Sequence, residues 1–178
     1  MKTQKFNSRA LSLAVASILA LSIGAFSGGS YAATATANLN VSATVTETCT
    51  ISTTALAFGE YVTGSGNVQK DGTGVVSTVC TIGTDSGIIT LSQGANPAGG
   101  SSTDVPLRQM ISGSDLLGYF LYSESTRTTV WGDTPATGLA TATGTGAETS
   151  LTVYGRIPAG QNKPAGNYTD TVVATVTW

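Results

Sequence analysis

The sequence predicts an all-β protein of one domain, a sandwich or a barrel, and three observations lead to this prediction. Short runs of alternating apolar and polar residues recur between turns rich in Gly, Pro, Asn and Ser. No stretch beyond the N-terminal segment has convincing helical periodicity. Only 10% of the 178 residues are charged, whereas Thr, Ser, Gly and Ala abound, which favours strands with hydroxyl-bearing outer faces.

Residues 1–32 are expected to be a secretory signal peptide that is removed on export. Lys2, Lys5 and Arg9 precede an apolar run, and small residues at Ser30 and Ala32 precede a cleavage position after Ala32. The alternative, a membrane anchor, is disfavoured because the run is short and no stop-transfer flank follows it. Removing these 32 residues leaves 146 of the 178, which is enough for one domain with a core.

The first expected strand lies within Ala33–Phe58, a stretch without glycine or proline in which small and aliphatic residues alternate with Thr, Asn and Ser. Fully extended, it would span about 85 Å, whereas a domain of this size is roughly 40 Å across. The stretch therefore either bends sharply or projects from its domain. A projecting strand with an apolar face is unstable in water and needs a groove on another molecule.

Further strands are expected between the turn signals, and the sandwich is expected to contain about seven strands besides the N-terminal segment. In chain order they are Gly74–Ile82, Gly87–Ser92, Val105–Ile111, Leu116–Ser123, Thr128–Asp133, Thr149–Ile157 and Tyr168–Trp178. Long loops are expected at 93–104, 134–148 and 158–167 from their Gly, Pro and Thr content.

The last expected strand carries one apolar face that runs to the final residue of the sequence. Its members are Tyr168, Val172, Ala174, Val176 and Trp178, with Asp170 as the only polar interruption. Chain ends fray unless a sheet holds them. This strand is therefore expected to be held in a sheet, with its far edge lacking a neighbour.

Two cysteines, Cys49 and Cys80, are 31 positions apart and form no metal-binding pattern. In an exported protein a structural disulfide between them is the expected state, and two free buried thiols are the alternative. A disulfide that joins two strands is typical of an immunoglobulin-like sandwich.

Composition argues against catalysis, nucleic-acid binding and direct lipid binding. The chain has no histidine, no nucleophile elbow and no phosphate-binding loop, so we expect no catalytic residue, metal site or cofactor. Without Lys2, Lys5 and Arg9, 5 basic residues face 10 acidic ones, which gives a net charge of −5. Such a chain is not attracted to phosphate backbones or anionic membranes.

Several segments resemble the spore coat protein U domain family, which includes the major pilins of archaic (Csu-type) chaperone–usher pili. The resemblance lies in the alternating N-terminus leading to "CTI", in "LAFGEY" (Leu56–Tyr61), in "LYSESTRTTVWGD" (Leu121–Asp133) and above all in Leu151–Trp178. It implies an incomplete immunoglobulin-like sandwich that lacks its last strand, with an N-terminal donor strand at 33–46 and a pilin domain at 47–178.

The resemblance also implies how such subunits assemble. The groove left by the missing strand is bordered by the C-terminal strand; a periplasmic chaperone fills it first, and an outer-membrane usher then lets the next subunit's N-terminal strand replace the chaperone. By position, the donor residues would be Ala35, Ala37, Leu39, Val41, Ala43 and Val45. The acceptor strand would carry Tyr168, Val172, Ala174, Val176 and Trp178.

The resulting hypothesis is a major shaft pilin of a surface pilus that serves adhesion and biofilm formation. A minor or adaptor pilin and a spore-coat-like surface protein are alternatives within the family. An exported carbohydrate-binding module is an alternative from another class, with Tyr119, Phe120, Tyr122 and Trp131 as an aromatic platform. In that alternative the N-terminal strand would close its own domain.

Overall fold

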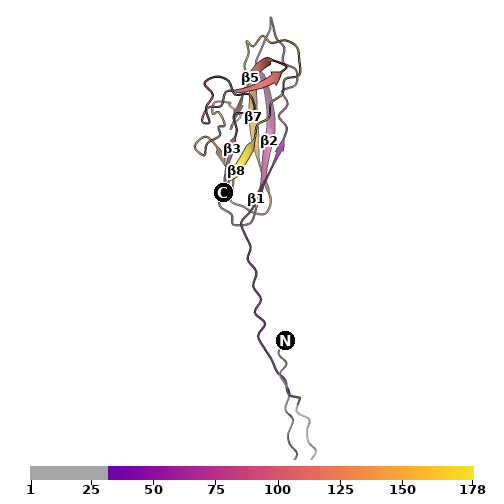
Figure 1. Cartoon of the computed structure of the whole chain (residues 1–178), viewed down its shortest axis with the longest axis vertical. Coiled ribbons are helices and arrows are strands. Elements are labelled where there is room, and N and C mark those ends of the chain that lie inside the picture. The colour runs from indigo at the N-terminus through magenta and orange to yellow at the C-terminus, as the bar shows by residue number, and fades with distance from the viewer. Residues whose placement is uncertain (1–31) are drawn as a thin grey trace, which may run out of the picture. The chain divides into compact units, whose positions relative to one another are not determined.

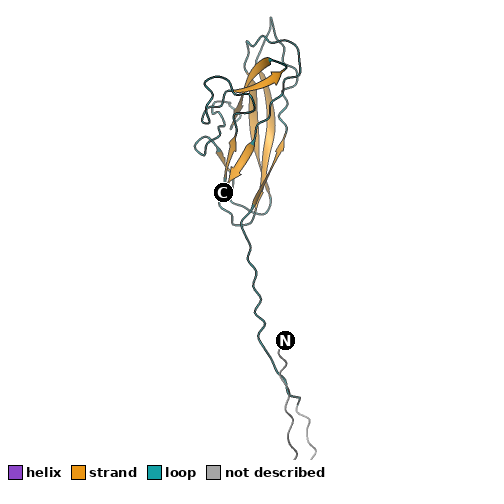
Figure 2. Ribbon diagram, viewed as in Figure 1, coloured by secondary structure: helices purple, strands orange, loops and turns teal. Residues whose placement is uncertain are grey.

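A computed structural model describes residues 32–178, and the expected signal peptide lies outside the described residues except for Ala32. Within this range the chain forms strands and loops only, as Figure 2 shows. The strands are β1 (Cys49–Thr54), β2 (Lys70–Cys80), β3 (Ile88–Leu91), β4 (Arg108–Ser112), β5 (Asp115–Tyr122), β6 (Leu139–Ala140), β7 (Glu148–Ile157) and β8 (Ala174–Thr177). The all-β prediction is confirmed.

The strands of the unit Ala43–Trp178 form two sheets around one core (Figure 1). The larger sheet has the order β1-β2-β7-β5-β4 and the smaller one the order β6-β3-β8, and all pairs are antiparallel. The core consists of Val76, Ile89, Leu91, Leu117, Tyr119, Leu121, Trp131, Val153 and Ile157.

Alternation along β5 shows why these residues form a half-buried sheet. Leu117, Tyr119 and Leu121 are buried, while the residues between them are only partly covered. Successive side chains of a strand point to opposite faces, so the apolar residues of one parity reach the core. The same period of two organises β7, in which Val153 and Ile157 are buried.

The stretch after β1 bends inward because glycines in the neighbouring strands leave room for it. Gly72 and Gly155 are register partners on β2 and β7. A Cβ at Gly155 would lie 2.8 Å from side-chain atoms of both Leu56 and Phe58, and one at Gly72 would lie 3.1 Å from a ring atom of Phe58. The chain therefore crosses close over the sheet without Gly or Pro of its own.

The C-terminal strand changes sheets along its length. Thr169 exchanges two backbone hydrogen bonds with Ile111 of β4 in the larger sheet, at 2.9 and 3.1 Å. From Ala174 onward the chain pairs with β3 of the smaller sheet. Regular strand geometry is thus confined to β8, which is shorter than the expected Tyr168–Trp178.

The prediction of a strand at Thr128–Asp133 is wrong. Only Val130 forms an isolated bridge there, with Tyr122. The segment instead inserts Trp131 into the core, where the indole Nε1 donates a hydrogen bond to the Ile89 carbonyl at 2.8 Å and no part of the side chain is exposed. The short strand β6 forms in the following stretch, which the sequence had indicated as a loop.

The Cys49–Cys80 disulfide is present, which confirms that prediction. It joins register neighbours on β1 and β2, so it links adjacent strands of one sheet and does not connect the two sheets across the core. The N–H of Thr81 donates to the Thr48 carbonyl at 2.9 Å just beyond it, which extends the pairing by one step.

Candidate functional site

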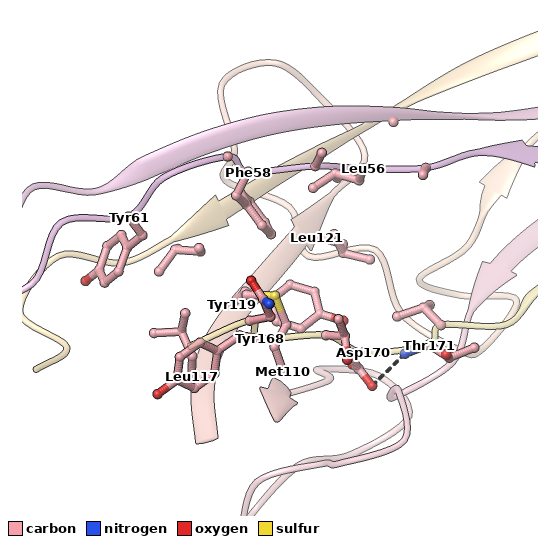
Figure 3. A pocket seen from close by; sticks show the side chains of 18 of the residues that line it. Leu56, Phe58, Tyr61, Met110, Leu117, Tyr119, Leu121, Tyr168, Asp170 and Thr171 are labelled. Atoms are coloured by element: carbon pink, nitrogen blue, oxygen red, sulfur yellow. Dashed lines mark hydrogen bonds between the residues drawn. The ribbon is translucent and has the colours of Figure 1, made fainter. Parts of the chain in front are cut away.

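An open groove of about 1170 Å³ lies between two segments that are not hydrogen-bonded to each other along its length. One wall is formed by residues 53–63, which follow β1, and the other by residues 163–172 together with Ala174. Figure 3 shows Leu56, Phe58 and Tyr61 on one side of this space and Tyr168, Asp170 and Thr171 on the other.

The floor of the groove is the hydrophobic core itself. Residues of four strands, β2, β3, β5 and β7, reach it, with Met110 added from β4. They are Val76, Leu91, Met110, Leu117, Tyr119, Leu121, Val153 and Ile157. A compact domain normally covers such residues with its own strand, so this groove is the place of a strand that residues 43–178 do not supply.

A hydrogen-bonded carboxylate interrupts the apolar lining. The Tyr119 hydroxyl donates to Asp170 Oδ2 at 2.6 Å, and the Ala95 N–H donates to Asp170 Oδ1 at 2.8 Å. Burial, followed by the hydrogen bond to Asp170, raises the pKa of Tyr119 well above its usual value, so the hydroxyl keeps its proton and remains a donor. Asp170 thereby fixes the strand at the point where it leaves the larger sheet.

Gly94 makes this arrangement sterically feasible. Its φ of +79° is in the left-handed region, and a Cβ at this position would clash with Asp170 Oδ2. Glycine is the one residue that both adopts this backbone conformation readily and leaves the carboxylate its space.

Arg108, the first residue of β4 in the larger sheet, is hydrogen-bonded to the end of β3 in the smaller sheet. Its guanidinium is buried and donates to the carbonyls of Ser92, Leu91 and Trp131 at 2.7–2.9 Å. Burial lowers the pKa of Arg108 to about 10, which leaves it charged at neutral pH. Two of these bonds satisfy carbonyls at the end of β3, those of Leu91 and Ser92, and the third satisfies the carbonyl of Trp131.

A hydrogen-bond network around Tyr61 holds the C-terminal end of the 53–63 wall. The Tyr61 hydroxyl donates to the Asn67 side chain and stands 2.8 Å from both Asn67 Oδ1 and the Pro158 carbonyl oxygen. The Gln161 side-chain amide in turn pairs with the backbone of Gly118 on β5, at 2.7 and 2.8 Å. The wall is therefore tied at this end to the turn after β7.

The residues expected to donate a strand are all exposed. Residues 32–48 contain no strand, and every side chain in this range is exposed. The three aliphatic members, Leu39, Val41 and Val45, are 87%, 85% and 83% exposed. Such exposure of large aliphatic side chains at regular spacing is costly in water unless a partner covers them.

The residues expected on the acceptor strand fall into two groups. Tyr168, Val172 and Ala174 line the groove. Val176 packs against the core below it, whereas Trp178 is 52% exposed and is outside the lining.

Sequence reasoning missed the opposite wall and the floor. Leu56, Phe58 and Tyr61 were noted only as part of a family resemblance. The signal that could have found them is the glycine pair Gly72 and Gly155, because glycines inside alternating strands mark close approach of another segment.

The four aromatic residues considered as a carbohydrate platform do not share one surface. Tyr119 and Trp131 are buried in the core. Phe120 and Tyr122 are on the opposite face of β5, with ring centroids 6.1 Å apart. Two of the four residues in the carbohydrate-platform hypothesis are therefore buried and cannot contact a carbohydrate at the surface.

A tight loop follows β5 on this outer face. The Oε1 atom of Glu124 accepts hydrogen bonds from the N–H groups of Thr128 and Thr129, both at 2.7 Å, and from the Thr128 hydroxyl at 2.6 Å. The loop also holds Arg127 in a left-handed conformation with φ of 57°. Partial burial raises the pKa of Glu124, but the hydrogen bonds outweigh it and lower the pKa to about 2.

Glu124→Gln should therefore destabilise the domain in a pH-dependent way. The folded pKa is below the ordinary value of 4.5, so the carboxylate's contribution is fully present above about pH 4.5 and is lost as the pH falls toward 2. We expect the melting temperature of the variant to be lower than that of the unmodified chain at pH 7, with a gap that narrows through this window. A gap independent of pH would contradict the prediction; Glu60→Gln is a control for the loss of one negative charge at an exposed site.

Residues 32–178 contain neither a metal-binding cluster nor a membrane-spanning helix. No group of three or more acidic or cysteine side chains is arranged to hold a metal ion within this range. The described part of the chain also contains no helix long and apolar enough to cross a bilayer.

The fold and the groove together define a class of protein: an immunoglobulin-like β-sandwich with one strand missing between two of its edges. A family model described as the spore coat protein U domain matches residues 35–175. The chain belongs to the spore coat protein U domain family.

Two similar proteins are consistent with this assignment. "Protein U" of Myxococcus xanthus is 46% identical over 180 residues, which cover 95% of this chain and 99% of that protein. One chain of the chaperone–tip adhesion subunit complex CsuC–CsuE, from archaic chaperone–usher Csu pili of Acinetobacter baumannii, has a similar fold. The TM-score is 0.54 at 21% identity, over 76% of this chain and 40% of that one.

Proposed function

We propose that this protein is a structural subunit of an archaic chaperone–usher pilus and that it polymerises by donor-strand exchange. In this proposal the segment 33–46 of one copy fills the groove of the next copy. The observation that carries the proposal is the floor of the groove, because it consists of the domain's own core residues. A groove with such a floor can accept one further strand, and a strand from another copy would complete the core there.

The free energy of assembly is that of completing a fold. Burying Leu39, Val41 and Val45 contributes about 1.5–3 kcal/mol each, or about 4–9 kcal/mol together. Backbone hydrogen bonds to both walls add to this and remove two exposed edges. Assembly of this kind needs no nucleotide.

The partners follow from the same groove. Before assembly a periplasmic chaperone would cover it with a strand of its own, and an outer-membrane usher would exchange that strand for the donor segment of the next subunit. The protein would then be exported through the periplasm into an extracellular pilus that serves surface adhesion and biofilm formation. We propose the role of shaft subunit, because one chain offers both a donor segment and a groove.

A second candidate is a surface coat built from the same polymer. It is favoured by the 46% identity to "Protein U" over nearly the whole chain and by the family's description as a spore coat domain. A minor or adaptor subunit of a pilus would use the same groove and the same segment.

Expression of the chain together with a periplasmic chaperone and an outer-membrane usher of the archaic type tests the proposal. We expect thin fibres on the cells by negative-stain microscopy, and ladders of subunits on gels of unheated samples. In hydrogen exchange, the amides of residues 35–45 should be protected in fibres and exchange freely in the chaperone-bound subunit. A soluble monomer in which these amides are protected would mean that the segment closes its own domain, and it would refute the proposal.

A further inference from the structure

Among the inward-facing residues of the C-terminal strand, Asp170 is the charged one. Covering it with an aliphatic side chain costs free energy, because the carboxylate loses contact with water. Asp170 lines the groove, and its carboxylate is held there by Tyr119 and the Ala95 N–H. A large apolar side chain placed against it would displace water from an ionised group and offer no hydrogen bond in return. A small side chain at the same position would leave the carboxylate in contact with water.

We propose that Asp170 sets the register in which a second copy's N-terminal segment docks, by accepting only Ala43 opposite it. This inference rests on the proposed function and specifies its geometry. The strands are antiparallel, and the sequence numbers of opposite residues add up to 213. Within the groove the inward pairs are then Val45–Tyr168, Ala43–Asp170, Val41–Val172 and Leu39–Ala174, and the same register continues beyond the groove lining with Ala37–Val176 and Ala35–Trp178.

Side-chain sizes are complementary in this register. Leu39, the largest donor residue, meets Ala174, the smallest lining residue of the strand. Below Ala174, β8 is in contact with β1 and residues 175–178 no longer line the groove. The alanines at positions 35 and 37 fall at this narrow end, where larger side chains would have no space.

Neighbouring registers place a large residue against the carboxylate. A shift by two residues in one direction puts Val41 opposite Asp170, and a shift by two in the other direction puts Val45 there. A shift by one turns the polar face of the segment into the groove. The next antiparallel register that offers an alanine puts Ala37 opposite Asp170, but it moves Val41 beside Gly166 and Val45 beside Asn162, away from the deep floor.

A parallel alignment with Ala37 at Asp170 would satisfy the size argument, but it does not build a fibre. Cys49, where β1 begins, lies at the same end of the domain as the end of β8 (Figure 1). In parallel docking, the donor's domain would therefore contact the acceptor at the same end that each domain uses to donate its own segment. Such a contact closes into a reciprocal pair, or into a monomer that inserts its own segment. Antiparallel docking places the donor's body at the Tyr168 end of the acceptor, and that contact repeats without closing.

Chain length excludes self-insertion in the antiparallel register. Val45 is four residues before Cys49, a reach of at most about 14 Å. Tyr168 is ten residues from the end of the C-terminal strand, or roughly 33 Å at extended spacing. A chain's own segment cannot bridge that difference, so the antiparallel groove is available only to another copy.

Cysteine pairs on the outward faces of the two strands test the register directly. Asn38, Ser42, Thr171 and Thr175 are exposed, so single replacements there leave the core unchanged. The proposal predicts oxidative cross-links between copies for Asn38→Cys with Thr175→Cys and for Ser42→Cys with Thr171→Cys. The exchanged pairs, Asn38→Cys with Thr171→Cys and Ser42→Cys with Thr175→Cys, should remain unlinked, because opposite residues alone approach to disulfide distance.

The outcomes separate this inference from the proposed function. Fibres that cross-link through the exchanged pairs, or through Asn38→Cys with Val173→Cys, would overturn the register and leave donor-strand exchange standing. Absence of both fibres and intermolecular cross-links would refute the proposed function and the register together.

A size change at the contact provides a second test. Ala43→Val should slow fibre growth about tenfold, the effect of overpacking a filled site. Ser42→Val adds similar bulk one residue away, on the outward face, and should leave growth unchanged. Equal rates for the two variants would contradict a contact between Ala43 and Asp170.

Discussion

Val41→Asp is expected to abolish fibres while each subunit still folds and binds its chaperone. The variant loses the burial of one aliphatic side chain, about 1.5–3 kcal/mol, and adds the cost of placing an unpaired carboxylate in an apolar groove, which is several kcal/mol. The groove itself is unchanged, so the acceptor function remains. Negative-stain microscopy measures the first effect, and co-purification with the chaperone measures the second.

Ser42→Asp is the matched control for this substitution. It introduces the same charge at the adjacent position, whose side chain belongs to the outward face of the alternating segment. Fibres should form with this variant. If Val41→Asp forms fibres as readily as Ser42→Asp, the alternation does not determine docking.

Cys80→Ser is expected to lower the stability of the subunit by about 3–4 kcal/mol, the value for a loop of this length. The structure explains why the loss would affect the groove. β1 is an edge strand with a single hydrogen-bonded neighbour, β2, and it continues directly into the 53–63 wall. Without the bridge, this wall is held by backbone pairing, by the contacts of Leu56 and Phe58 and by the hydrogen bonds of Tyr61 at its far end.

Periplasmic yield of the chaperone-bound subunit and its urea unfolding midpoint measure this effect. The double variant with Cys49→Ser and Cys80→Ser should behave like the single one, because the lost bridge and not a reactive thiol causes the change. An unchanged yield and midpoint in both variants would show that the bridge is dispensable.

The alternation of apolar and polar residues and the cysteine pair predicted the strands and the disulfide, because these features depend on neighbouring residues and on the expected compartment. The period of two placed β2, β3, β5 and β7 to within a few residues at most ends, because one apolar face is enough to specify a half-buried strand. The cysteine pair was predicted from the expected compartment alone. The alternation at residues 168–176 also correctly indicated which side chains turn inward.

Features that depend on contacts between distant segments were not predictable. The run Thr128–Asp133 has the composition of a strand, yet Trp131 enters the core, where its indole N–H donates a hydrogen bond to the Ile89 carbonyl. Asp170 looked like an interruption of an apolar face, and its role required the positions of Tyr119 and Ala95. The 53–63 wall depends on glycines in two other strands.

The position of the disulfide has a mechanical consequence for such a fibre. In the proposed fibre, tension between neighbouring copies would enter each domain through the segment before Cys49, the first residue of β1. The bond to Cys80 passes this load at once to β2, an interior strand paired with β7 over ten consecutive positions. Pulling therefore loads that long ladder in shear, and the short edge strand cannot be peeled away one hydrogen bond at a time.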